Sequence, residues 1–210
     1  MNPLGRQYYI HNVPVFVVGE PEENLDFPEF CTDAEDLLTS SLLTNIDVTY
    51  VGDFPELNGR NATYANGAIY MSGREPTNFD MLENFVHEVA HSLEPAYGEF
   101  IYSEDFLNEF RGKRQRLCNI LKAHGYNVSD RLCNFIEYNA QFDNFLAHDV
   151  GYPTLLNLTM GLFASPYGAT SIQEYFANGF EKYLLEDPRS IKTVSPILYR
   201  KIESILNDEA

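Results

Sequence analysis

Two histidines stand four residues apart in the stretch FVHEVAHSLEP, and a glutamate directly follows the first of them. On an α-helix His87 and His91 project from one face, a turn apart, so their imidazole nitrogens can bind one cation. Zinc favours such nitrogen ligands. Glu88 borders that face, where its carboxylate can take a proton from zinc-bound water and pass it to a leaving amine. The HExxH spacing therefore predicts zinc-dependent hydrolysis of peptide bonds.

An ordinary helix with satisfied histidines is the alternative to a zinc site. The other residues from position 85 to position 93 are all uncharged, so the polar triplet lies in a segment that is expected to be buried. A glutamate buried without a partner would be costly, which favours a functional reason for Glu88.

A catalytic zinc site needs a third protein ligand and an open position. Glu94 lies near the histidine face, but it directly precedes Pro95, which disfavours helical geometry at Glu94. His124 and the pair His148-Asp149 fit better as groups at the ends of helices or on the surface. These residues therefore make poor candidates for the third ligand.

Glu174, near the start of a second amphipathic helix, is a better candidate. Ser171 and Glu174 also match a capping box, in which the glutamate needs no metal. Thr170 with Gln173 would form the same box one residue earlier and leave Glu174 free. Periodicity alone leaves both interpretations open.

Taken together, HEVAH and the downstream YGATSIQEYFANGF resemble the protease domain of anthrax lethal factor and the related Pro-Pro endopeptidases. In that family a glutamate in an E-F/Y-F-A-x-x-F setting is the third zinc ligand, and the matching residue is Glu174. A tyrosine seven residues before that glutamate supports the transition state, and the matching residue is Tyr167. The resemblance implies a zincin-like fold, one Zn²⁺ per chain and an endopeptidase with Glu88 as general base and Tyr167 as oxyanion stabiliser.

The resemblance covers residues 78–95 and 165–206, so residues 96–164 are interpreted as a helical insertion. Asn178 stands where the family carries a second acidic residue, four positions after the ligand. If that acid orients a zinc-bound histidine, Asn178 would do so only as a neutral group. Weaker support of this kind would lower the metal affinity by about 10-fold or more.

The first third of the chain is predicted to be β-rich with one helix, and it has to hold the histidine helix. Two Asn-Gly pairs, at 58–59 and 66–67, are hairpin signals. The expected elements are a strand at 8–18 interrupted by Pro14, a helix at 32–43 capped by Thr32 and Glu35, and strands at 46–52 and 67–73.

The strand GAIYMSG precedes the histidine helix and is expected to lie near the site. Its residues Ile69, Tyr70 and Met71 are predicted either to form a sheet edge, to which an extended substrate adds as a strand, or to pack within the sheet. Tyr64 and Tyr70 are candidates for lining the substrate cleft.

From about residue 77 the periodicity becomes helical. A capping box at Thr77 and Asp80 predicts a helix over 77–95 that ends at Pro95. The fold class is predicted to be α+β in a single domain over 1–210, with a small twisted N-terminal sheet in 1–76, an edge strand over the histidine helix, and a mainly helical C-terminal portion. The later helices are expected at 103–124, 130–147, 152–163, 171–186 and 194–207.

The chain has 210 residues and a net charge of −17, with 31 acidic against 14 basic residues. Such acidity excludes nucleic acid and anionic membranes as expected partners. An extended polypeptide that is not strongly acidic remains as the expected substrate. Two further interpretations stay open: an interaction domain that keeps the peptidase fold without catalysis, and a structural helix pair that binds metal without turnover.

The three cysteines, at positions 31, 118 and 133, have spacings that match no zinc or redox motif. We expect them to be reduced thiols. The N-terminal sequence has no basic region followed by an uninterrupted apolar run, so no secretory signal is predicted and a cytoplasmic location is expected. The Asn-X-Ser/Thr sites at Asn61, Asn127 and Asn157 then carry no glycosylation meaning.

Overall fold

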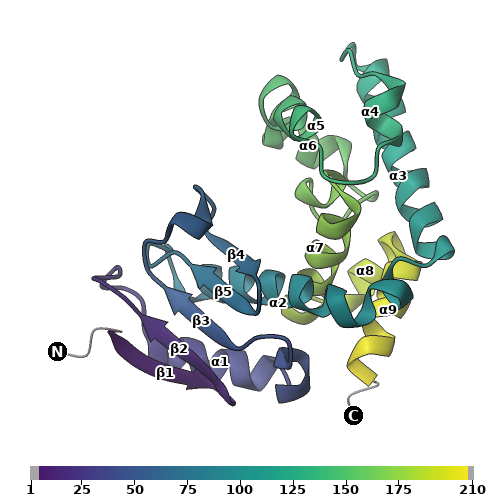
Figure 1. The fold of residues 1–210 in the computed structure, drawn as a ribbon. Coiled ribbons are helices and arrows are strands. Elements are labelled where there is room, and N and C mark those ends of the chain that lie inside the picture. The colour runs from purple at the N-terminus through teal and green to yellow at the C-terminus, as the bar shows by residue number, and fades with distance from the viewer. Residues whose placement is uncertain (1–4, 208–210) are drawn as a thin grey trace. The chain divides into compact units, whose positions relative to one another are not determined.

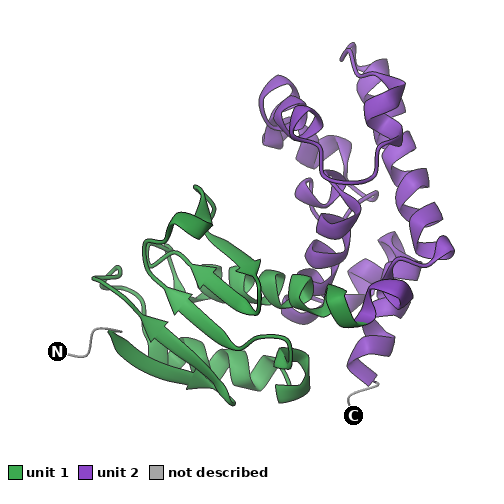
Figure 2. Ribbon diagram, in the orientation of Figure 1, with its two compact units in different colours: residues 1–96, 209 green, residues 97–208, 210 purple. Residues whose placement is uncertain are grey.

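A computed structural model describes residues 5–207 of the chain. The chain forms two compact units, with unit 1 ending at Ala96 and unit 2 starting at Tyr97 (Figure 2). Unit 1 contains a five-stranded sheet and unit 2 is helical, which confirms the predicted α+β class (Figure 1). None of the helices within residues 5–207 is both long enough and apolar enough to cross a membrane.

The sheet of unit 1 mixes antiparallel and parallel pairs in the order β1-β2-β3-β5-β4. β1 pairs with β2 and β4 with β5 in antiparallel fashion, whereas β3 pairs in parallel with both β2 and β5. The strands are β1 (Arg6–Ile10), β2 (Val13–Val17), β3 (Val48–Val51), β4 (Ala62–Ala65) and β5 (Ala68–Met71).

One face of the sheet is buried, and alternate residues of β2 and β3 point into it. The register places Val15, Thr49 and Ile69 in one row across β2, β3 and β5, and all three are fully buried. α1 (Phe27–Leu37) and α2 (Asn78–Ile101) lie on one side of the sheet (Figure 1). Phe30 of α1 and Phe85 of α2 meet edge to face at a centroid distance of 5.7 Å.

The predicted edge role of Ile69, Tyr70 and Met71 is wrong. These residues form β5, which is flanked by β3 on one side and by β4 on the other. Tyr70 lies on the face opposite Ile69 and stacks on Tyr50 at 5.4 Å, so it does not face the histidine helix. The sheet edge nearest in sequence to that helix belongs to β4.

Two of the predicted N-terminal elements need correction. The single interrupted strand at 8–18 is a hairpin of β1 and β2 that turns at His11, where φ is 51°. The helix expected at 32–43 is α1, which starts at Phe27 because the side chain of Asp26 accepts a hydrogen bond from the backbone N–H of Glu29. Thr32 is inside this helix, and Ser40–Leu43 forms a separate 3₁₀ turn, η1.

The two Asn-Gly pairs serve different purposes. Asn66 and Gly67, with φ values of 50° and 80°, form the two-residue turn between β4 and β5, as predicted. Asn58 instead caps the 3₁₀ turn η2 (Pro55–Leu57) in the left-handed conformation, so the first pair forms no hairpin.

Helix α2 begins as predicted, because Thr77 accepts from the backbone N–H of Asp80 and donates to its carboxylate. The predicted end at Pro95 is wrong, since the helix continues to Ile101. Proline removes one backbone donor and favours extended geometry in the preceding residue. Burial of Leu93 and Ile101 on either side of Pro95 explains why the helix nevertheless persists.

Unit 2 is built on α3 (Glu104–Ala123), whose Phe106 and Phe110 pack against Tyr175 of α7 at centroid distances of 5.4 and 5.3 Å. The helices expected at 103–124, 171–186 and 194–207 are confirmed. The helix expected at 130–147 is divided, and the one expected at 152–163 is shorter. The remaining elements are α4 (Asp130–Asn134), α5 (Ala140–Asn144), the π-helical turn η3 (Phe145–Gly151), α6 (Tyr152–Leu158), the 3₁₀ turn η4 (Tyr167–Ala169), α7 (Ile172–Leu185), α8 (Pro188–Val194) and α9 (Pro196–Asn207).

The expectation of three reduced thiols is wrong. Cys118 of α3 and Cys133 of α4 form a disulfide, while Cys31 is a free thiol buried in unit 1. The two half-cystines lie on consecutive helices, and this tertiary arrangement brings together residues whose spacing matches no motif. Burial, and then the charge of Glu35, raise the pKa of the Cys31 thiol to about 12.

Candidate metal centre

Helix α2 presents the two histidines on one face, as the spacing predicts. Their rings meet edge to face with centroids 5.0 Å apart, and both side chains are half-buried. The opposite face fixes the helix, because Phe85, Val86 and Val89 are fully buried. The sequence therefore places the imidazoles at the boundary of the core, where they stay partly exposed.

His91 is oriented by its own helix. Its Nδ1 lies 2.7 Å from the Glu94 carboxylate, and both side chains are about one-fifth exposed. A carboxylate bonded to one ring nitrogen fixes the ring and leaves the other nitrogen, Nε2, as the ligand atom. Glu94 is thus helical despite Pro95, and it supports His91 instead of competing as a ligand.

Glu88 is 8% exposed and contacts the strand β4. Its carboxylate accepts a hydrogen bond of 2.6 Å from the backbone N–H of Tyr64. The Tyr64 hydroxyl donates to the carbonyl of Asn45, and the Asn45 side chain donates to the carbonyl of Ser92 on α2. Tyr64 thus joins β4 to α2 directly through its backbone N–H and indirectly, by way of Asn45, through its hydroxyl.

Glu174 stands in the first turn of α7. The hydroxyl of Ser171 accepts a hydrogen bond of 3.1 Å from the backbone N–H of Glu174, so the Ser171 cap is the one that forms. The cap uses the backbone of Glu174 and does not exclude a metal-binding role for its carboxylate. The same turn is tied to the loop after α4, since the N–H of Ile172 donates to the carbonyl of Ile136 at 2.9 Å.

Tyr167 begins the turn η4 that leads into α7. Its carbonyl accepts hydrogen bonds from both the backbone N–H and the hydroxyl of Thr170, at 2.9 and 2.8 Å. Asn178 lies one turn below Glu174 and is 5% exposed. Its amide donates to the Glu174 carbonyl and its oxygen accepts from the Ser165 hydroxyl, so within unit 2 Asn178 supports the segments that carry Glu174 and Tyr167.

His87, His91 and Glu174 form a group that could hold a metal ion, since one ligand atom from each lies within 4.8 Å of the other two. Two imidazoles and one carboxylate form a donor set that catalytic zinc sites use, with the fourth position left for water or substrate. The residues present therefore fit zinc in number and in chemistry. No other group of this kind occurs among residues 5–207.

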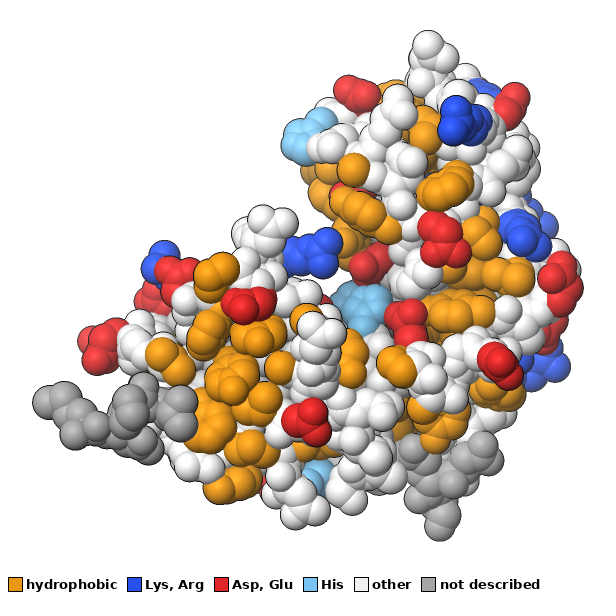
Figure 3. Space-filling view, in the orientation of Figure 1, with side chains coloured by type: hydrophobic (Ala, Val, Ile, Leu, Met, Phe, Trp, Pro, Cys, Tyr) orange, Lys and Arg blue, Asp and Glu red, His pale blue; other side chains and the backbone are white. Residues whose placement is uncertain are grey.

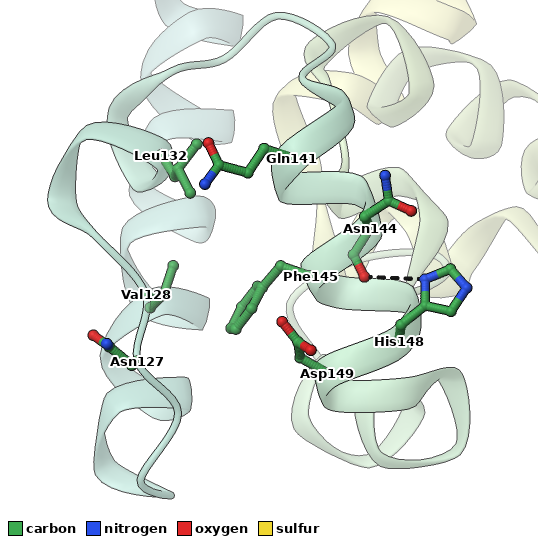
Figure 4. Close-up of a pocket in the computed structure, with 8 residues that line it drawn as sticks. All are labelled: Asn127, Val128, Leu132, Gln141, Asn144, Phe145, His148 and Asp149. Atoms are coloured by element: carbon green, nitrogen blue, oxygen red, sulfur yellow. Dashed lines mark hydrogen bonds between the residues drawn. The ribbon is translucent and has the colours of Figure 1, made fainter.

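The other histidines that the sequence raised as ligands lie elsewhere. His124 caps the end of α3, where its Nδ1 bonds the carbonyl of Ile120 at 2.9 Å. His148 and Asp149 line a separate cavity of about 660 Å³ in unit 2. Figure 4 shows Phe145 pointing across this cavity toward Val128, and the bond from the His148 ring to the carbonyl of Asn144.

Sequence reasoning missed two buried cations of α3. Lys113 is 7% exposed and donates to the carbonyls of Leu162 and Val194. Arg114 is fully buried and donates to the carbonyl of Ala169, two residues after Tyr167. Their position on the apolar stripe of Phe106, Phe110 and Leu117 is the signal that could have identified them, because charged residues are seldom placed on such a face.

The chain was compared with protein-family models, with curated proteins and with solved structures, and none of them matches.

Proposed function

We propose that this chain is a zinc-dependent endopeptidase of the kind that its HExxH helix and downstream glutamate resemble. One observation carries the proposal. His87 and His91 lie far from Glu174 in the sequence, and the resemblance in the sequence predicts all three as ligands. Their ligand atoms nevertheless lie within 4.8 Å of one another. Resemblance and geometry thus support the same donor set independently.

In the proposed reaction, His87, His91 and Glu174 hold the metal and other residues handle the protons. A bound zinc ion would supply a Lewis acid that polarises the peptide carbonyl and lowers the pKa of water. Glu88 accepts a proton from the attacking water and returns it to the leaving amine. Tyr167 donates a hydrogen bond to the oxyanion that develops on the carbonyl.

The substrate in this proposal is an extended polypeptide that adds to the edge of β4. The N–H of Tyr64 already points to Glu88 and not to β5, so the general base contacts the unpaired edge of the sheet. A peptide that paired with β4 would lie beside the carboxylate that activates water. The net charge of −17 supports a substrate that is not strongly acidic.

The Cys118–Cys133 disulfide indicates in which kind of compartment the protein acts. Disulfides are rare in the reducing cytosol and persist in oxidising compartments. The Cys118–Cys133 bond therefore counts against the cytoplasmic location expected from the N-terminal sequence. The proposal accordingly places the enzyme in an oxidising compartment.

Metal content by native mass spectrometry tests the proposal, and the chain offers matched control variants. His87→Ala is compared with His148→Ala, and Glu174→Ala with Asp149→Ala, because His148 and Asp149 lie outside the group. We expect one zinc per chain in the wild type and in both controls, no zinc in His87→Ala and weakened binding in Glu174→Ala. A cleavage screen on a peptide library then tests for catalysis.

A folded wild type that takes up no zinc would overturn the proposal. The interaction domain without catalysis would then be the better interpretation. Zinc at full occupancy without cleavage of any peptide would instead favour the structural helix pair.

A further inference from the structure

Arg114 is a fully buried cation without a carboxylate partner among the described residues of the chain. Its guanidinium donates only to backbone carbonyls there: Nη1 to Ala169 at 2.6 Å and to Thr170 at 3.3 Å, and Nη2 to Phe135 at 3.4 Å. The cation also lies over the ring of Phe142, 3.7 Å from its centroid. These contacts join three segments of unit 2 to α3.

Burying a cation in this position is energetically unfavourable. Burial lowers the pKa of Arg114 to about 9, which reflects the cost of removing the charge from water without an ion pair. Even a buried ion pair can often be replaced by apolar residues of similar volume without loss of stability, so overall stability is a poor reason for placing an unpaired arginine here. The geometry of its contacts offers a better one.

Both ends of the guanidinium fork reach segments that meet the first turn of α7. Ala169 and Thr170 close the turn that begins at Tyr167, and Thr170 directly precedes Ser171, the cap of α7. Phe135, at the other end of the fork, begins the loop after α4.

That loop in turn holds the start of α7. The carbonyl of Ile136 accepts from the N–H of Ile172 at 2.9 Å, and the carboxylate of Glu137 accepts from the Gln173 side chain at 2.6 Å. Arg114 thus links the two segments that enclose the start of the helix carrying Glu174.

We propose that Arg114 is a positioning residue, whose guanidinium fixes the turn of Tyr167 and the first turn of α7 together and so places the Tyr167 hydroxyl and the Glu174 carboxylate. This role rests on the proposed function. The same role explains part of the segment 96–164, because this segment contains both Arg114 and the loop after α4 that the guanidinium contacts. A lysine would replace it only in part, since a single ammonium lacks the planar fork that spans two carbonyl groups.

The test compares Arg114→Met with Lys113→Met. Both variants remove a buried cation that donates to backbone carbonyls, and they alter adjacent residues of one helix, but the carbonyls that Lys113 binds belong to Leu162 and Val194. Zinc affinity is measured by chelator competition and folding by thermal melting. We expect Arg114→Met to bind zinc about 10- to 100-fold more weakly than the wild type. Losses of this size follow when a group that orients a metal ligand is removed. Lys113→Met should keep the affinity of the wild type.

Steady-state kinetics on a peptide found in the cleavage screen gives a second readout. Misplacement of Tyr167 should lower kcat in Arg114→Met while KM stays near the wild-type value. Arg114→Lys keeps the positive charge, and it serves as the test variant if Arg114→Met does not fold. We expect it to show an intermediate loss of zinc affinity.

Wild-type zinc affinity in folded Arg114→Met and Arg114→Lys would overturn the inference and leave the proposed function standing. If the wild type itself binds no zinc, the proposed function fails, and amide hydrogen exchange still tests the positioning. In that case the N–H groups of Ile172 and Glu174 should exchange faster in Arg114→Met than in Lys113→Met. Equal exchange in the two variants would reject the role of Arg114.

Discussion

The carboxylate of Glu88 accepts a hydrogen bond from the backbone N–H of Tyr64 at a distance of 2.6 Å. This bond connects the residue that follows the first histidine with the strand at the edge of the sheet. A backbone donor at this distance holds the carboxylate in one place. The proposed general base and the proposed site of the substrate backbone are therefore adjacent in the fold.

Replacing Glu88 by glutamine should abolish catalysis without releasing the metal. The amide keeps the size of the side chain but cannot accept a proton from water, and general-base catalysis contributes about 10²- to 10⁴-fold. Zinc content and peptide cleavage are measured together, with Glu99→Gln, an exposed position on the same helix, as the control. Cleavage by Glu88→Gln at the wild-type rate would show that another residue is the base.

Glu94→Gln should weaken zinc binding although Glu94 is not a proposed ligand. The variant replaces the carboxylate that lies 2.7 Å from Nδ1 of His91. Loss of such a partner lowers metal affinity by about 10- to 100-fold. Chelator competition measures the change, again against Glu99→Gln. An unchanged affinity would mean that the contact with Glu94 does not orient His91 for the metal.

Glu75→Gln should stabilise the protein relative to the wild type, and this gain in stability should be larger at pH 8 than at pH 5. Glu75 is 2% exposed, and burial, followed by the charge of Asp80, raises the pKa of its carboxyl. The native state therefore keeps the proton to higher pH than the unfolded chain does, and wild-type stability falls as the pH rises through this window. Glutamine has no proton to lose.

Thermal melting at several pH values measures this effect. The difference in Tm between Glu75→Gln and the wild type should increase with pH, whereas that of Glu56→Gln, an exposed position, should stay flat. A difference for Glu75→Gln that does not change with pH would show that the carboxyl of Glu75 is not destabilised by its surroundings.

The disulfide should be visible as a difference in thiol count. Under denaturing conditions without reductant, only Cys31 should be alkylated, and all three cysteines should react after reduction. The bonded cysteines are 15 residues apart, so reduction should lower the free energy of unfolding by about 3 kcal/mol. Intact mass and urea unfolding measure the two effects. Three reactive thiols before reduction would contradict the pairing.

The histidine helix was predictable because its signals are local. Thr77 and Asp80 cap it, and the apolar residues around His87 repeat at helical spacing. The end of the helix was not predictable from Pro95, because burial of Leu93 and Ile101 outweighs a local preference. Asp26, followed by a proline at 28, was a usable signal for the start of α1 that Thr32 concealed.

Strand order and side-chain pairing depend on contacts that are distant in the sequence. The pattern of GAIYMSG suits an edge strand as well as an inner one, and only the pairing of β3 with β5 shows which applies. Cys118 and Cys133 meet because α3 and α4 are neighbours, and nothing in their spacing indicates that. The residues proposed for metal binding can be recognised in the sequence because HExxH and EYFANGF carry the signal in short stretches. The contacts of Arg114, in contrast, exist only in the folded chain.

The mixed order of the strands has a consequence for the rate at which the two units fold. Joining β2 to β3 in parallel requires the chain to close a loop that contains all of α1, and joining β3 to β5 requires a second closure around β4. Such distant pairings slow folding, whereas helices form through contacts between near neighbours. In pulse-labelled refolding, amides within α3 and α7 should gain protection before those of β3, so that these helices are present while the sheet is still assembling.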